Sequence, residues 1–256
     1  MLVVTWNVNS LNARLPRVLE FLAEHEPDVV CLQETKCSAQ AFPLGELEQA
    51  GYRAVHHSAG RWAGVALLAR DVLDISEPHL GLPGEPAAEE ARWCEARIAG
   101  VRFVSVYVPN GRSPENPEFQ RKLEFLDAMA SRVGELADRP LLLAGDLNIA
   151  PADIDVYDPS AFVDCTHVTP QERSRLEAIL DRGMIDAYRK LHPETVQYTW
   201  WDYRAGHFHR GFGLRIDLAL LTRELEPRLS GCGIDRNYRK GQKPSDHAPL
   251  LVELSD

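Results

Sequence analysis

Hydrophobic residues near the N-terminus recur first with the spacing of a helix and then in a short unbroken run. The helical spacing is carried by Leu11, Leu15, Val18, Leu19 and Leu22. Pro27 and Asp28 then interrupt this stripe, and the apolar run Val-Val-Cys-Leu follows them. Since an apolar segment also precedes the stripe, this region predicts a strand, a helix and a second strand.

The same alternation returns further along the chain. Apolar residues spaced from Phe119 to Leu136 form a second helical stripe, which leads into the run Leu-Leu-Leu-Ala-Gly at 141–145. The sequence Thr-Pro-Gln-Glu at 169–172 predicts the start of a third helix, because threonine caps a helix, proline suits its first position and glutamate completes a capping box. Gly183 is expected to end that helix. A mixed α/β architecture follows.

Three further segments have strand patterns. Residues 101–109 alternate so that Val104 and Val106 face one way while Phe103 and Tyr107 face the other. The segments Leu-Arg-Ile-Asp-Leu-Ala-Leu-Leu and Pro-Leu-Leu-Val-Glu-Leu predict late strands. The two loose stretches, 77–90 and 110–117, have the length of loops rather than linkers, so we expect a single domain over residues 1–256.

Polar residues stand where several of these apolar runs end. They are Asn7, Asn9, Glu34, Tyr107, Asp146, Asn148, Asp217, Asp246 and His247. Each has an ordinary explanation when taken alone, such as an Asx turn for Asp146 or a half-buried histidine for His247. Asp217 is harder to dismiss, because a charge between Ile216 and Leu218 must be paired when it is buried. Ligands bind at the carboxyl ends of strands in open α/β sheets, so together these residues predict one site.

The chemistry of this set favours a metal-assisted reaction. It holds carboxylates, amides and one imidazole, and the chain has neither a Gly-x-Ser-x-Gly elbow nor a cysteine placed beside a catalytic histidine. Hard oxygen ligands favour Mg²⁺, with Mn²⁺ as a substitute, over zinc. A hard cation beside carboxylates suits hydrolysis of phosphate esters, where charge on phosphate oxygens must be neutralised.

The net charge of −10 argues at first against a nucleic-acid substrate, because phosphate binding depends on lysine and arginine. Global charge is a weak objection, since a metal and a local basic patch tolerate an acidic remainder. Arg236, Arg239, Lys240 and Lys243 form a candidate patch. An ordinary solvated loop explains them equally well.

The remaining composition indicates a cytoplasmic protein. Five cysteines are an odd number without a Cys-x-x-Cys pair, so neither a disulfide framework nor a zinc cluster is predicted. The N-terminus has no basic region followed by a long apolar run, and no membrane span is expected. The chain has no obvious dimerisation element, so a monomer is expected.

The ordered motifs TWNVNSL, VVCLQETK, VYVPNG, GDLNIAP, TWWDYR, GLRIDL and SDHAPL closely resemble the exonuclease III family of DNA repair nucleases, within the endonuclease/exonuclease/phosphatase superfamily. The resemblance covers nearly the whole chain. It implies a four-layered α/β sandwich, in which two packed β-sheets are flanked by helices. It also implies a Mg²⁺-dependent enzyme that acts on double-stranded DNA as a 3′→5′ exonuclease, a 3′-phosphodiesterase or phosphatase, and an abasic-site endonuclease.

The resemblance also implies roles for individual residues. Glu34 would be the principal metal ligand with Asn7 beside it, and Asp246 would complete the acidic cluster or a second metal position. Asp146 would activate the attacking water, which Asn148 would steady. His247, held by Asp217, and Tyr107 would contact the phosphate or the leaving oxygen. The residues expected to bind substrate are Asn9, Asn110, His167, Trp200, Trp201 and Phe212, although one of the two tryptophans is expected to belong to the core.

Two positions depart from the family pattern. Phe212, in Arg-Gly-Phe-Gly, offers a hydrophobic wedge where relatives have residues that contact phosphate. His167 stands where many relatives carry glycine or serine. A bulky imidazole there would obstruct an internal abasic site while leaving a frayed 3′ end accessible, which predicts an enzyme specialised for 3′ ends.

Two alternatives remain. A phosphodiesterase acting on phosphoinositides or sphingomyelin would share the superfamily, but TWWDYR and GLRIDL resemble the repair branch. A catalytically silent DNA-binding module would be expected to have lost a metal ligand or Asp146, and this chain retains them.

Overall fold

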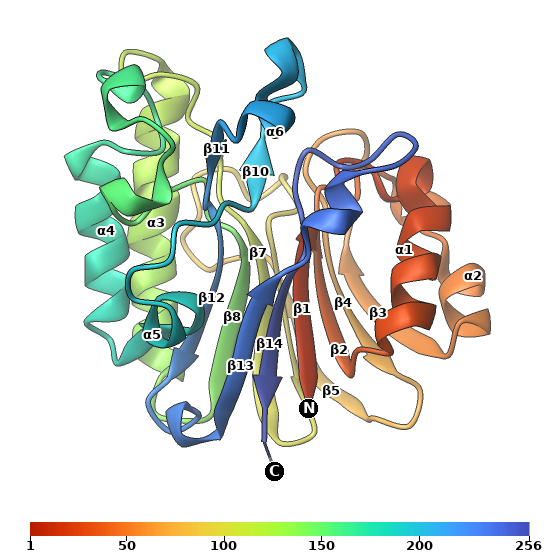
Figure 1. The fold of residues 1–256 in the computed structure, drawn as a ribbon. Helices are drawn as coiled ribbons and strands as arrows, with labels where there is room; N and C mark the ends of the chain where they lie inside the picture. Colours follow the sequence, from red (N-terminus) through yellow and green to blue (C-terminus); the bar gives the residue numbers. More distant parts are fainter. Residues whose placement is uncertain (256) are drawn as a thin grey trace.

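The computed structural model describes residues 1–255, which fold into two six-stranded sheets packed face to face (Figure 1). The first sheet has the order β13-β14-β1-β2-β4-β3, with β1 (Leu2–Asn7), β2 (Val29–Gln33), β3 (Tyr52–His57), β4 (Val65–Arg70), β13 (Leu229–Ile234) and β14 (Leu250–Leu254). The second has the order β5-β6-β7-β8-β12-β9, with β5 (Ile75–Leu80), β6 (Trp93–Ile98), β7 (Val101–Tyr107), β8 (Leu141–Asp146), β9 (Met184–Asp186) and β12 (Asp217–Thr222). A separate pair joins β10 (Trp200–Trp201) to β11 (Gly213–Leu214).

Helices cover the outer face of each sheet. The helices are α1 (Leu11–His25), α2 (Leu44–Gln49), α3 (Pro117–Leu136), α4 (Pro170–Leu180), α5 (Ala187–Leu191) and α6 (His207–Arg210). In Figure 1, α1 and α2 lie outside the first sheet, whereas α3 and α4 lie outside the second. The four-layered α/β sandwich implied by the resemblance is therefore confirmed.

Three hydrophobic clusters fill the spaces between these layers. The central one joins the two sheets and includes Val3, Leu67, Phe103 and Leu142. The other two lie between the second sheet and α3 and α4, and between the first sheet and α1 and α2. The alternation predicted for residues 101–109 is observed, because Phe103 packs in the central cluster whereas Val104 and Val106 pack beneath α3.

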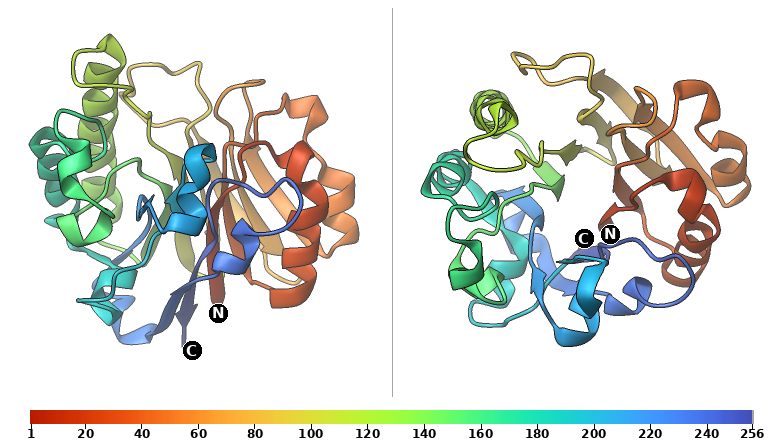
Figure 2. Two further views of the ribbon diagram at one scale, coloured as in Figure 1. Left: turned by 45° about the horizontal axis from the view of Figure 1, so that its top comes forward. Right: turned by 90° about the horizontal axis from the view of Figure 1, so that it is seen from above.

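The direction of the strands brings distant residues to one end of the sandwich. β1 runs parallel to β2 with Asn7 opposite Gln33, and β7 runs parallel to β8 with Tyr107 opposite Asp146. β12 runs antiparallel to β8 and begins with Asp217, also opposite Asp146. The right-hand view of Figure 2 shows this end of the sandwich from above. Both chain termini lie at the other end, which is at the bottom of Figure 1. The polar strand ends of the sequence therefore gather at one edge.

The predicted helices are present, with small differences in length. The capping box is confirmed, because Thr169 and Glu172 exchange hydrogen bonds at the start of α4. The helix ends at Leu180, and Gly183 lies in the following turn with a φ of +91°. All five cysteines are free, with Cys31, Cys37 and Cys94 buried. Within residues 1–255, none of the helices combines the length and apolarity needed to cross a membrane.

Candidate active site

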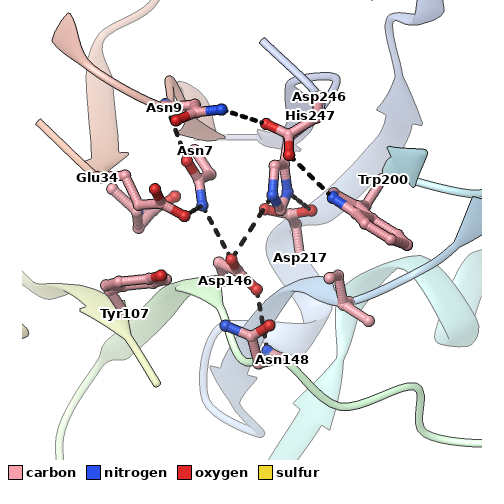
Figure 3. A network of polar contacts seen from close by, with 12 residues as sticks. Asn7, Asn9, Glu34, Tyr107, Asp146, Asn148, Trp200, Asp217, Asp246 and His247 are labelled. Atoms are coloured by element: carbon pink, nitrogen blue, oxygen red, sulfur yellow. Dashed lines mark hydrogen bonds and ion pairs between the residues drawn. The ribbon is translucent and has the colours of Figure 1, made fainter. Parts of the chain in front are cut away.

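Polar side chains from both sheets meet at the end of the sandwich where β1, β7 and β8 stop and β12 begins (Figure 3). Asn7, the last residue of β1, donates from Nδ2 to Glu34 Oε1 at 2.8 Å and to Asp146 Oδ2 at 2.9 Å. Glu34 follows β2 of one sheet, whereas Asp146 ends β8 of the other. One amide therefore links the two sheets and holds two carboxylates close to each other.

Strand β8 ends in glycine and aspartate because β7 leaves no room for a side chain just before the carboxylate. A Cβ on Gly145 would lie 1.9 Å from the carbonyl oxygen of Val106. The chain then turns at Asn148, whose φ is +53° and whose backbone N donates to Asp146 Oδ1 at 2.9 Å. This is the expected Asx turn, and it leaves the other oxygen of Asp146 directed into the cluster.

His247 lies between two aspartates. Its Nδ1 donates to Asp217 Oδ2 at 2.8 Å, and its Nε2 lies 3.7 Å from Asp146 Oδ2. Burial opposes the charged imidazolium, but the carboxylates of Asp217 and Asp146 outweigh it and raise the pKa of His247 to about 10. The histidine is therefore a cation at neutral pH, and a free lone pair for a metal is not available on it.

Burial lowers the pKa of a histidine but raises the pKa of an acid, and in this cluster it acts on Asp146 and Tyr107. It raises the pKa of Asp146 to about 7, with the negative charges of Asp217 and Glu34 acting in the same direction and His247 opposing them. Burial, followed by the charge of Glu34, also raises the pKa of Tyr107 well above its usual value. Asp146 thus changes its protonation near neutral pH, whereas Tyr107 remains a phenol.

Glu34, Asp146 and His247 form a group whose ligand atoms all lie within 4.8 Å of one another. Since His247 is protonated, the carboxylates of Glu34 and Asp146 are the donors suited to a cation. The side chain of Glu34 is 13% exposed and that of Asp146 is 2% exposed, so Glu34 is the more accessible ligand. Lys36 Nζ lies 2.5 Å from Glu34 Oε2 and balances its charge.

Asn7 and Asp246, both predicted to bind metal, have other contacts in this structure. Asn7 turns its amide nitrogen toward the carboxylates, and its Oδ1 accepts from the backbone N of Asn9 at 3.0 Å. Asp246 lies outside the acidic group, and its two oxygens accept from Asn9 Nδ2 at 3.0 Å and from Trp200 Nε1 at 3.1 Å. Each of these oxygens accepts one hydrogen bond and keeps a second lone pair, so the direct metal contact predicted for Asn7 and Asp246 stays a prediction.

The comparisons with known proteins match this fold over its whole length. The model of the "Endonuclease/Exonuclease/phosphatase family" matches residues 4–247. Exodeoxyribonuclease III of Haemophilus influenzae is 30% identical over 267 residues, which cover 99% of this chain and 100% of that protein. The chain belongs to this family, in its exonuclease III branch.

Solved structures of the same branch agree. Two structures of NExo from Neisseria, described as a 3′-5′ exonuclease and as a 3′ phosphatase bound to a product DNA hairpin, each superpose with a TM-score of 0.97 at 38% identity. An AP endonuclease from Archaeoglobus fulgidus superposes with a TM-score of 0.96 at 33% identity. Each alignment covers 100% of both chains.

In this member of the family, the two adjacent tryptophans differ. Trp200 is partly exposed and contacts Asp246, whereas Trp201 is fully buried. The ring of Trp201 packs against Phe208 in an edge-to-face arrangement with centroids 5.1 Å apart. Trp201 is thus the core residue of the pair, and substrate contact by Trp201 is corrected because its ring is inaccessible.

Phe212 lies away from the polar cluster. Its ring stacks on Tyr157 with a centroid distance of 4.5 Å and an interplanar angle of 12°. The guanidinium of Arg210 lies 4.1 Å from the ring centroid. Both contacts hold the ring within an aromatic group, so the wedge role of Phe212 stays a prediction that requires these contacts to open.

Asn110 and His167 contact each other and Asn148, at the edge of the polar cluster. Asn110 Nδ2 donates to Asn148 Oδ1 at 3.3 Å and lies 3.5 Å from His167 Nε2. His167 Nδ1 contacts the carbonyl oxygen of Asn148 at 2.7 Å. Burial, followed by the charge of Lys122, lowers the pKa of His167 to about 4, so the imidazole is neutral. The predicted obstructing ring is therefore fixed beside the site.

The predicted basic patch is only partly available to a ligand. Arg239 is buried, and its Nη2 donates to the carbonyl oxygen of Trp201 at 3.2 Å. Arg236, Lys240 and Lys243 are exposed. The patch therefore has three accessible cations instead of four.

Some residues of the site were not predicted from the sequence. Lys36 contacts both Glu34 and Asn9, and its only signal was its place in the motif Leu-Gln-Glu-Thr-Lys. Thr199 accepts from the backbone N of Asp217 at 3.1 Å and so fixes the start of β12. Ser245 Oγ donates to the carbonyl oxygen of Asn7 at 2.7 Å, which joins the loop before His247 to β1.

Proposed function

We propose that this chain is a divalent-metal-dependent phosphodiesterase that hydrolyses DNA at abasic sites and at blocked or recessed 3′ ends of duplexes. The observation that carries the proposal is the pairing of Asp146, which ionises near neutral pH, with the imidazolium of His247 beside an acidic metal group. The activities described for NExo and for the Archaeoglobus AP endonuclease support DNA as the substrate.

The donors present fit a hard divalent cation. Glu34 would be the principal ligand, and Asp146 faces the same point. Oxygen donors of this kind favour Mg²⁺, with Mn²⁺ as a substitute. When bound, the cation would supply charge neutralisation on the phosphate oxygens. Lys36 Nζ pairs with Glu34 Oε2, whereas Glu34 Oε1 is the oxygen that accepts from Asn7.

The side chains of this site divide the proton chemistry between them. Asp146 would accept the proton of the attacking water, because its carboxylate faces the acidic group and a cation bound there would keep it ionised at neutral pH. His247 enters the reaction already protonated and stabilises negative charge as it develops on the phosphate. Tyr107 donates a hydrogen bond to the phosphate or to the leaving oxygen, because it remains a phenol.

Two amides complete the proposed site. Asn148 is held by Nδ2 donation to the carbonyl oxygen of Val108 at 2.9 Å, which leaves its side-chain oxygen directed toward Asn110. In the proposed site, Asn148 would orient the attacking water and Asn110 would contact the substrate. Asn9 and Trp200, joined through Asp246, would line the opposite side.

The experiment that tests this function compares two labelled duplexes, each incubated with Mg²⁺ and with chelator. One duplex carries an internal abasic-site analogue, and the other carries a recessed 3′ end with a terminal phosphate. We expect metal-dependent cleavage of at least one duplex. If neither duplex is cleaved in the presence of metal, the proposal is contradicted. A phospholipid substrate or a silent DNA-binding module would then be favoured instead.

The position of His167 favours a variant of this function, in which 3′-end processing dominates over internal incision. Its neutral ring is fixed between Asn110 and the carbonyl oxygen of Asn148, beside the predicted binding pocket. An imidazole there would exclude a sugar within an intact duplex more strongly than a frayed 3′ end. NExo, described as a 3′ phosphatase, is consistent with this proposal.

Replacing His167 with glycine is expected to raise incision at the internal abasic site by ~10-fold or more, because the obstructing ring is removed. Removal of the 3′ phosphate should change much less. Glycine is also tolerated by the backbone, since the φ of His167 is +81°. Initial rates on the two duplexes provide the measurement.

A matched control is available in the same loop. Asp164 is exposed and also has a positive φ, +57°, so Asp164→Gly changes the backbone without touching the ring. Equal effects of His167→Gly on both substrates, or an increase in incision caused by Asp164→Gly, would show that the ring does not select the substrate.

A further inference from the structure

A fully buried lysine lies beneath the loops on the substrate side of the site. Lys122 belongs to the inner face of α3, and its side chain is 0% exposed. Its Nζ donates to the carbonyl oxygen of Asn148 at 2.7 Å and to that of Asn110 at 3.2 Å. No step of the proposed reaction uses this ammonium group.

Glu172 is the counter-ion of this lysine and extends the network to a third loop. Both residues are fully buried, and their ammonium and carboxylate groups form an ion pair. Glu172 Oε1 also accepts from the backbone N of His167 at 2.9 Å and from Thr166 Oγ1 at 2.8 Å. Its other oxygen accepts from Thr169 in the capping box of α4. The pair therefore joins α3 and α4, which lie side by side in Figure 1, to three loops.

The space around the lysine is closely filled. A Cβ on Gly111 would lie 2.9 Å from Lys122 Cδ and 3.2 Å from Thr166 Oγ1. The positive φ of Gly111, +83°, turns the loop so that the carbonyl of the preceding Asn110 reaches the ammonium group. The chain around Asn110 thus has little freedom to move while the lysine is in place.

A buried ion pair adds little net free energy of folding, so stability alone does not explain this one. Two buried charges lose their hydration, and a pair of apolar side chains of similar volume often stabilises a protein equally well. Unlike an apolar side chain, the ammonium group donates hydrogen bonds. It donates to the backbone carbonyls of Asn110 and Asn148, which lie in loops outside the β-strands. A role in geometry therefore accounts better for the pair than a role in stability.

We infer that Lys122, paired with Glu172, is a positioning residue that fixes the substrate side of the active site. It sets the places of the loops that carry Asn110, Asn148 and His167, and through them the rate of turnover and the preference for 3′ ends. The inference rests on the proposed function for its effect on catalysis. The fixing of the loops is a structural statement that holds independently of the substrate.

The test compares Lys122→Met with Arg132→Met. Arg132 lies on the same helix and also pairs with a fully buried glutamate, Glu95, outside the active site. Both variants remove one cation from α3 and leave a buried carboxylate with one partner fewer. Two measurements are made on each protein: amide hydrogen exchange along the chain, and kcat and KM on the two duplexes.

For Lys122→Met we expect faster exchange confined to residues 109–112, 147–150 and 165–168. We also expect kcat for 3′-phosphate removal to fall by ~10- to 100-fold with little change in KM, because reacting groups are displaced while binding is retained. The ratio of internal incision to 3′-phosphate removal should rise, since His167 loses its fixed position. Arg132→Met should leave both kcat values and the ratio unchanged.

Unchanged exchange in the three loops, or equal losses of kcat in the two variants, would overturn the inference. If Lys122→Met does not fold, the double variant Lys122→Met with Glu172→Gln removes both charges and leaves none unpaired, and the same expectations apply to it. If the unaltered chain cleaves neither duplex, the proposed function fails, and hydrogen exchange alone decides whether Lys122 holds the loops.

Discussion

Replacing Asp146 with asparagine is expected to abolish turnover while leaving DNA binding nearly unchanged. Asparagine has the same size and keeps a side-chain oxygen that can accept from Asn7 or from the backbone N of Asn148. It has no carboxylate to receive the proton of the attacking water, so kcat should fall by at least ~10³-fold. Single-turnover cleavage in excess Mg²⁺ and DNA affinity by fluorescence anisotropy measure the two effects separately.

The stability of the same variant distinguishes a catalytic role from a structural one. Burial raises the pKa of Asp146 to about 7, so the folded chain binds this proton more tightly than the unfolded chain does. Stability is therefore lost as the pH rises from the unfolded pKa, near 4, through about 7. At pH 8 the neutral asparagine should give the metal-free protein an equal or higher Tm. A lower Tm together with lost DNA binding would instead make Asp146 a structural residue.

The ends of the strands that form the site were largely predictable from the sequence, because a change of polarity has a direct physical meaning. Burial of a carboxylate or amide costs free energy unless the group is paired, so such a residue after an apolar run marks a point where a buried strand can leave the core. Glu95, paired with Arg132, is an exception that stays buried within β6. Asn7, Tyr107 and Asp146 each end a strand, whereas Asp217 begins β12. Parallel pairing of β1 with β2 and of β7 with β8 then gathers these ends at one edge.

The orientation of side chains within the site was not predictable from the same pattern. The sequence did not indicate that Asn7 Oδ1 accepts from the backbone N of Asn9 or that its Nδ2 donates to Glu34. Trp200 and Trp201 are consecutive aromatic residues, so the sequence does not distinguish them. In the structure they pair with Leu214 and Gly213 of β11, and Trp201 is the one that is buried. Such choices depend on atoms that lie far away along the chain.

Lys122 and Glu172 show the limit of local reasoning most clearly. The capping box at 169–172 correctly predicted that Glu172 reaches back to Thr169. The sequence around Lys122 is that of an amphipathic helix, in which a lysine normally points to solvent. Their contact joins residues fifty positions apart along the chain and requires α3 to pack beside α4. The same packing brings the carbonyls of Asn110 and Asn148 to the ammonium group.

Replacing Asp217 with asparagine is expected to reduce kcat by ~10²- to 10⁴-fold and to move the alkaline limit of activity to lower pH. Asp217 is the carboxylate that contributes most to raising the pKa of His247 to about 10, against the effect of burial. The protonated form is the active one, so activity is lost as the pH rises through that pKa. Burial lowers the pKa of His247, and without the charge of Asp217 less remains to counteract it. The pKa of His247 therefore falls, and a smaller fraction of the histidine is protonated near pH 8. The profile of kcat from pH 6 to pH 10.5 at saturating metal measures the shift.

A nearby aspartate supplies the control for this profile. Asp186, at the end of β9, pairs with Arg215, whereas the carboxylates that raise the pKa of His247 are those of Asp217, Asp146 and Asp246. Asp186→Asn should therefore keep the alkaline limit in place even if it lowers stability. An unchanged limit in Asp217→Asn would mean that another group sets the charge of His247. A shift of equal size in both variants would assign the alkaline limit to unfolding instead, because the two substitutions share only the loss of an aspartate that pairs with a cation. A shift in Asp217→Asn alone would establish that the imidazolium, held by its carboxylate, carries the positive charge that the reaction needs.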